Sequence, residues 1–105
     1  MKNITEITMT NSKKKTTVRT EVRELDGIEY RYELTSSRAT DVASYGLPLY
    51  SVSVSMHFRD TGRVSEGRTE NIFSDVNKAG RFFDKIVDNL ATPIDLPYIV
   101  EDELA

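Results

Sequence analysis

The single histidine of the chain, His57, lies in an alternating segment with Ser51, Ser53 and Ser55 and shares one face of the expected strand with them. A serine beside a histidine can act as a nucleophile with its general base, but a triad also needs a buried carboxylate and an oxyanion hole. The sequence contains no Gly-x-Ser-x-Gly elbow or equivalent. We therefore interpret His57 as a solvent-facing residue, and we expect no catalytic residues and no enzymatic activity.

Acidic residues offer the remaining chemistry. Asp84 and Asp88, four residues apart, share one face of an expected helix, and Glu101-Asp102-Glu103 is a local cluster. Paired carboxylates can exchange protons or hold a divalent cation, but no third ligand-bearing element accompanies them, so a solvated acidic face is the preferred interpretation. The glycines form no P-loop or dinucleotide fingerprint. We expect no metal, no cofactor and no small-molecule substrate.

The overall composition restricts the class of protein. A chain of 105 residues is long enough for one hydrophobic core. It contains no cysteine, which fits a reducing compartment, and no apolar run of the roughly 18 residues that a membrane-spanning helix needs. The N-terminus also lacks the apolar segment of a secretory signal. We expect a cytoplasmic protein without membrane contact.

The hydrophobic pattern divides the chain into an arm and a domain. Residues 1–15 have no period and are rich in Thr, Asn, Ser and Lys, which predicts a disordered arm. Lys13-Lys14-Lys15 could touch a phosphate backbone, but a solvated tether is the preferred interpretation. Residues 16–105 are expected to form a single α+β domain. Its elements are a four-stranded antiparallel meander of two hairpins, one amphipathic helix packed on one face, and a short C-terminal helix.

The first hairpin is predicted on both sides of Asp26-Gly27. Its inward residues are Val18, Thr20 and Val22 in the first strand and Ile28, Tyr30, Tyr32 and Leu34 in the second. A two-residue loop would pair Val22 with Arg31 and set an apolar face beside a polar one. We therefore predict a three-residue loop, Leu25-Asp26-Gly27, that pairs Val22 with Tyr30 and places Gly27 in a left-handed conformation.

The second hairpin is predicted to follow a long connection, Ser36 to Pro48. Its first strand has an apolar face of Tyr50, Val52, Val54, Met56 and Phe58, and a polar face of Leu49, Ser51, Ser53, Ser55, His57 and Arg59. A loop of Asp60-Thr61-Gly62 would pair Phe58 with Val64. The last strand, Val64 to about Ile72, carries Glu66, Arg68 and Glu70 at expected apolar positions. We predict a charged edge strand in which Gly67 marks a bulge.

An amphipathic helix is predicted from an N-cap at Ser74, with Asp75 in the first turn, to about Leu90. Its apolar stripe consists of Val76, Ala79, Phe83, Ile86, Val87 and Leu90. Phe82 falls at the margin, either under the tail or as an exposed anchor for self-association. We favour the exposed position because the stripe covers a sheet without it. Gly80 is expected to allow close approach of the helix to the sheet or to kink the helix.

The C-terminal tail is predicted to return to the core. Thr92-Pro93 ends the first helix, and Leu96, Ile99, Val100 and Leu104 form a second short stripe. Asp95 is a plausible cap, and Pro97 fits a helix only in its first turn. A tail this apolar is expected to be buried.

Several segments resemble one known family. The tail Thr92-Pro93-Ile94-Asp95-Leu96 with Ile99-Val100-Glu101-Asp102 and Leu104, together with Tyr30-Arg31-Tyr32-Glu33-Leu34 and Ser44-Tyr45-Gly46-Leu47, resembles the domain of unknown function 6514 family of small clostridial-type bacterial proteins. The resemblance implies strands followed by a helix and a short acidic tail helix. Pro97 and the long connection before Tyr45 depart from the pattern. The resemblance implies no activity, cofactor or site residue.

Two functions remain open. The first is a non-enzymatic protein-interaction or regulatory module with an unknown protein partner or a second copy, which would use the polar sheet face of Ser51, Ser53 and His57, or Phe82 and the tail. The alternative is weak binding of single-stranded nucleic acid across the polar face, where Arg19, Arg23, Arg31 and Arg63 would gather with the serines and His57. That face offers no aromatic side chain on which bases could stack, so nucleic acid is disfavoured.

Overall fold

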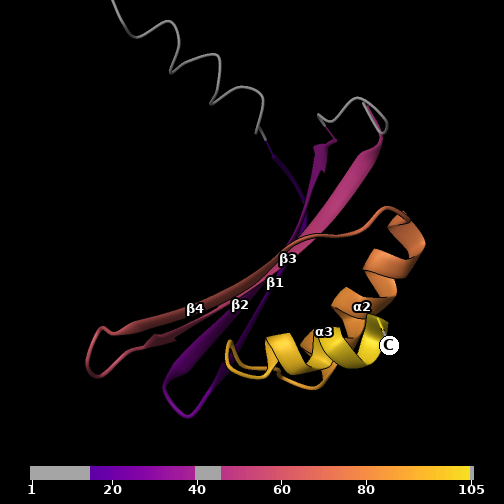
Figure 1. Cartoon of the computed structure of the whole chain (residues 1–105). Coiled ribbons are helices and arrows are strands. Elements are labelled where there is room, and N and C mark those ends of the chain that lie inside the picture. Colours follow the sequence, from indigo (N-terminus) through magenta and orange to yellow (C-terminus); the bar gives the residue numbers. More distant parts are fainter. Residues whose placement is uncertain (1–14, 40–45, 105) are drawn as a thin grey trace, which may run out of the picture.

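A four-stranded antiparallel meander and two helices make up the α+β fold, as predicted. The computed structural model describes residues 15–39 and 46–104. The strands are β1 (Thr16–Leu25), β2 (Ile28–Arg38), β3 (Pro48–Phe58) and β4 (Val64–Phe73), and they lie side by side in chain order. The helices are α2 (Val76–Asp88) and α3 (Leu96–Leu104). The predicted disordered arm of residues 1–15 lies outside the described residues except for Lys15 (Figure 1).

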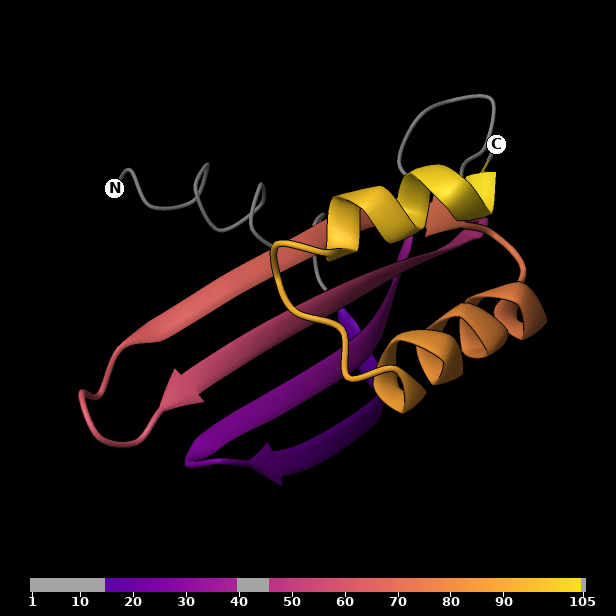
Figure 2. The same ribbon diagram turned by 90° about the horizontal axis from the view of Figure 1, so that it is seen from below.

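The helices α2 and α3 both pack on one side of the sheet, with α2 across β2 and β3 and α3 along β4 (Figures 1 and 2). We call this side the covered face and the opposite side the open face. Because successive strand residues point to opposite sides, each strand contributes alternate residues to each face. The covered face holds the core, whose buried members include Tyr30, Tyr32, Leu34, Val52, Val54, Phe83 and Ile86.

The first hairpin turns through two residues, so the predicted three-residue loop is wrong. Leu25 pairs with Ile28 and Val22 pairs with Arg31. Both loop residues have positive φ, 53° for Asp26 and 76° for Gly27, which is the geometry of a type I′ turn. The twist of such a turn matches that of the strands, and this local preference prevails over the expected pairing of apolar faces.

This register puts Arg19, Glu21 and Arg23 of β1 on the covered face and places Val22, which is exposed, on the open face. Arg19 shows how a charged residue of β1 can lie beside apolar residues at the edge of the core. Its guanidinium lies 4.8 Å from the centre of the Phe83 ring and 2.9 Å from a carboxylate oxygen of Asp84. An arginine stem can cover apolar surface while its charged end stays paired and wet, so this edge needs no apolar side chain.

The second hairpin is also shifted by one residue from its predicted register. His57, not Phe58, pairs with Val64, and the Phe58 amide donates a hydrogen bond to the Arg63 carbonyl. Gly67 pairs regularly with Val54, and the register shift falls instead beside Asn71, whose φ is 53°. Glu66, Arg68 and Glu70 therefore lie on the open face, where water rather than core surrounds them. The connection to β3 is shorter than predicted because β2 continues to Arg38, which pairs with Pro48.

The two glycines outside turns have different roles from those predicted. A Cβ at Gly67 would lie 2.9 Å from the Pro93 carbonyl oxygen, so Gly67 lets the segment between the helices pass close over β4. A Cβ at Gly80 would meet nothing within 4 Å. Gly80 therefore serves no close approach to the sheet, and α2 runs through it without interruption.

Helix α2 begins one residue later than predicted. Asp75, rather than Ser74, is the N-cap, and its carboxylate accepts hydrogen bonds from the amides of Asn77 and Lys78. These bonds to the charged form hold the pKa of Asp75 below its ordinary value. Phe82 is 1% exposed and its ring centre lies 5.3 Å from that of Phe73. The preferred exposed position of Phe82 is wrong, because the apolar stripe of α2 is broad enough to include it.

The tail packs back on the sheet, although less completely than predicted. Thr92 and Asp95 exchange hydrogen bonds between side chain and amide in the turn before α3, the reciprocal pattern of a capping box, and the Asp95 carbonyl accepts a hydrogen bond from the Ile99 amide of α3. Leu96 is buried, and Ile99 and Val100 are partly buried against the core. Leu104 is 57% exposed, so it lies outside the core.

Candidate interaction surface

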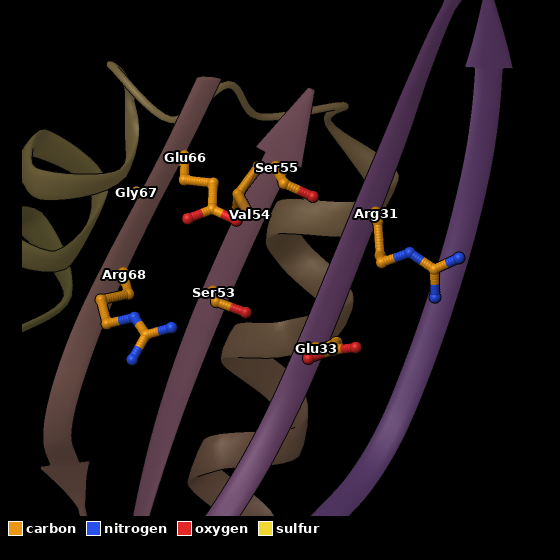
Figure 3. Close-up of a pocket in the computed structure, with 8 residues that line it drawn as sticks. All are labelled: Arg31, Glu33, Ser53, Val54, Ser55, Glu66, Gly67 and Arg68. Carbon is orange, nitrogen blue, oxygen red and sulfur yellow. The ribbon is translucent and has the colours of Figure 1, made fainter. Parts of the chain in front are cut away.

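Two neighbouring rows of residues form the centre of the open face. In the first row Glu33 of β2, Ser53 of β3 and Arg68 of β4 lie side by side. In the second row the order of charges is reversed, with Arg31 on β2, Ser55 on β3 and Glu66 on β4. Figure 3 shows these side chains with α2 behind the sheet. The small serines leave a hollow of about 180 Å³ between the longer flanking side chains.

Ion pairs on this face run both along the strands and between segments, where Arg59 contacts Glu24 and Glu29. Arg31 lies 3.6 Å from Glu29 of its own strand, and Arg68 lies 3.3 Å from Glu70 of its own strand. Lys15 donates a hydrogen bond of 2.6 Å to Glu70, which is the main reason that the pKa of Glu70 lies below its ordinary value. Within residues 15–39 and 46–104, Glu33 and Glu66 have no ion pair, so their carboxylates are free for an outside cation.

The polar residues predicted for this surface lie on it, in different environments. Ser53 is half-buried in the hollow. Ser51 is only 5% exposed, because its hydroxyl accepts a hydrogen bond of 2.8 Å from the Asn71 amide beside the register shift. His57 is exposed between Glu29 and Val64. No hydrogen bond joins His57 to a serine in the part of the chain that the structure describes. Phe82 belongs to the core and not to any surface.

The arginines expected to gather with the serines are divided between the two faces. Arg19 and Arg23 pair with Leu34 and Tyr30 and belong to the covered face. The Arg63 guanidinium lies 5.0 Å from the centre of the Phe58 ring, on that same side. Of the arginines expected to gather with the serines, only Arg31 lies on the open face. Carboxylates outnumber guanidinium groups on the open-face strand positions, where Glu24, Glu29, Glu33, Glu66 and Glu70 stand against Arg31 and Arg68.

Two acidic groups on the helices form ion pairs, whereas Asp88, Glu101 and Asp102 form none within the described ranges. Asp84 contacts Arg19, and Glu103 lies 3.3 Å from Lys85. Among the described residues no three His, Asp or Glu side chains come together in a way that could hold a metal ion. None of the described helices is long and apolar enough to cross a membrane.

Helix α3 presents a second, apolar surface. Tyr98 is 67% exposed, and with Pro97, Val100, Glu101 and Leu104 it borders a shallow hollow. Ile94, just before the helix, is also exposed. Ile94, Tyr98 and Leu104 are exposed apolar side chains, so they are a comparison surface for the open face.

The sequence interpretation missed that Glu33, Glu66 and Arg68 belong to one surface with the serines. Strand alternation carried the signal for Glu33, because Arg31 and Glu33 alternate with Tyr30 and Tyr32 in β2 and so share the face opposite the core. Strand alternation then brings the polar face of β3 beside them.

Comparison with known proteins gives one match. The model of a family of unknown function, DUF6514, matches residues 8–105. No curated protein and no solved structure matches the chain significantly.

Proposed function

The chain belongs to the DUF6514 family of unknown function, and since this membership assigns no activity, we propose a function from the open face: a non-enzymatic protein-interaction module. One observation carries the proposal. Both described helices cover one face of the sheet, while the other presents ordered rows of charge around a serine-lined hollow. Rows of side chains on a rigid sheet present a fixed pattern of charge to a partner, which gives binding its specificity.

The charge balance of the open face supports a protein rather than a nucleic acid as the partner. Phosphate binding needs a surplus of Lys and Arg, and base stacking needs exposed aromatic rings. The open face has a surplus of carboxylates, and its strand positions are occupied by Glu, Arg, Ser, Thr, Val, Leu and His rather than by Phe or Tyr.

Affinity capture from the native cell tests the proposal when three baits are compared. Ser53→Arg fills the hollow, Tyr98→Ser changes the outer surface of α3, and wild type is the reference. We expect proteins that wild type and Tyr98→Ser retain and that Ser53→Arg loses. Thermal melts of each bait check that all three are folded.

Retention by Ser53→Arg together with loss by Tyr98→Ser would move the function to α3 and contradict the proposal. A salt titration with random single-stranded oligonucleotides tests the alternative, because phosphate contacts give binding that weakens steeply with salt. Tight, salt-sensitive oligonucleotide binding that Ser53→Arg abolishes would also overturn the protein-interaction proposal.

A further inference from the structure

We infer that the partner of the open face is a second copy of this chain, an inference that rests on the proposed function. The argument begins with the order of charges in the two central rows. The first row reads Glu33, Ser53, Arg68 from β2 to β4, and the second reads Arg31, Ser55, Glu66. The four charged positions therefore form a rectangle in which each side joins unlike charges and each diagonal joins like charges (Figure 3).

This rectangle complements a copy of itself. A two-fold axis in the plane between two facing sheets and parallel to β3 would place Glu33 opposite the copy's Arg68 and Arg31 opposite its Glu66. An axis across the strands would place Glu33 opposite the copy's Arg31 and Arg68 opposite its Glu66. Either arrangement pairs every charge with its opposite, as the self-complementary interface of a symmetric dimer requires.

The shape of the surface also permits two sheets to face each other. Ser53 and Ser55 form a low strip between the longer side chains of β2 and β4, with the hollow of about 180 Å³ above it. Two such strips can approach until the flanking Glu and Arg side chains meet. Glu33 and Glu66, which have no ion pair within the described ranges, would then gain cations from the copy.

The size of the face predicts a weak dimer. Strands of 10 to 11 residues at about 3.3 Å per residue, spaced about 4.8 Å apart, give a footprint of roughly 600 Å². Stable complexes bury about 800 Å² on each partner, and charge pairs must lose solvent as they form. We therefore expect association that depends on concentration and that weakens as salt is added.

A charge-swap experiment tests the inference with sedimentation of the full chain over a concentration series. Arg31→Glu with Arg68→Glu makes the rectangle acidic, and Glu33→Arg with Glu66→Arg makes it basic. Each double variant alone should weaken self-association at least about tenfold, because like charges then face each other. An equimolar mixture should restore the dimer. Lys78→Glu with Arg81→Glu, on exposed positions of α2, makes the same change in net charge as the acidic double variant and should leave the dimer intact.

The absence of cysteine allows a second measurement that needs no charge reversal. Ser53→Cys should form a disulfide-linked dimer in mild oxidant if the axis is parallel to β3, and a mixture of Ser53→Cys with Ser55→Cys should cross-link if the axis lies across the strands. Tyr98→Cys is the control that should not cross-link at the same rate.

A wild type that stays monomeric at all concentrations, or variants that associate as wild type does, would overturn the inference. So would cross-linking that is fastest for Tyr98→Cys. None of these outcomes decides the proposed function, which the capture experiment tests separately. Face-dependent capture of other proteins by a monomeric wild type would mean that only the second copy is wrong.

Discussion

The covered face and the open face of the sheet come from the same four strands but differ in what their side chains do with water. On the covered face, rings and branched chains such as Tyr32, Val54 and Phe83 are removed from solvent and packed together. On the open face, Glu and Arg side chains stay in solvent around a strip of serines. Burial of apolar area provides most of the stability of a small domain, whereas exposed ion pairs contribute little. The difference implies that substitutions on the two faces should separate stability from binding.

Phe82 should give the largest effect on the covered face. We expect Phe82→Ala to lower the free energy of unfolding by about 3–5 kcal/mol, because it leaves a cavity where the ring contacted Phe73. Arg68→Gln on the open face should change that free energy by no more than about 0.5 kcal/mol. Urea denaturation of both variants provides the measurement, and similar losses for the two would remove the contrast between the faces.

Two glycine substitutions sharpen the contrast by having opposite signs. Gly67→Ala should destabilise the fold by about 1–3 kcal/mol, because its Cβ would lie 2.9 Å from the Pro93 carbonyl oxygen on the covered side. Gly80→Ala should stabilise it by up to about 1 kcal/mol, because the added methyl meets no atom and alanine favours a helix. Thermal or urea melts of these two variants measure both changes in stability. Equal effects of the same sign would refute the close passage of the chain over Gly67.

Tyr32 should give a smaller effect that depends on pH. Its hydroxyl donates a hydrogen bond of 2.9 Å to the Ala91 carbonyl, so Tyr32→Phe should cost about 1 kcal/mol at neutral pH. Burial raises the pKa of Tyr32 from 10.0 to about 12, so the folded state holds the phenol proton more tightly than the unfolded state does. The stability that this provides is complete below about pH 10 and is lost as the pH rises through about 12.

Urea melts over that pH range compare wild type with Tyr32→Phe, in which every other titrating group is unchanged. The variant should lose stability less steeply than wild type between about pH 10 and about pH 12. Parallel declines would show that the phenol ionises as it does in the unfolded chain.

Much of the fold was predictable from the sequence, because alternation and helical period report which residues avoid water. The two hairpins, the edge position of β4 and the places of both helices follow from those patterns. The registers were not predictable in the same way. Pairing apolar with apolar residues argued against the two-residue turn, but Arg19 can cover Phe83 as well as an aliphatic residue would. Turn geometry therefore decided the register of the first hairpin.

The candidate surface was predictable only in part. The polar face of β3, with Ser53 and His57, follows from alternation alone. The charged neighbours Glu33 and Arg68 do not, since their places beside Ser53 depend on the registers of β2 with β3 and of β3 with β4. Phe82 was wrongly expected at the surface, because a helix stripe read from the sequence has no sharp margin. The width of the sheet decides which rings are buried.

Amide spectra recorded by NMR over a concentration series test the central claim most directly, because they report each face in one sample. We predict concentration-dependent shifts at the central rows of the open face, including Arg31, Glu33, Ser53, Ser55, Glu66 and Arg68, with Phe82, Ile86 and the exposed surface of α3 unchanged. Shifts that gather at Tyr98 and Leu104 would contradict the assignment of binding to the open face, and a spectrum that does not change up to the highest concentration would contradict the second copy as its partner.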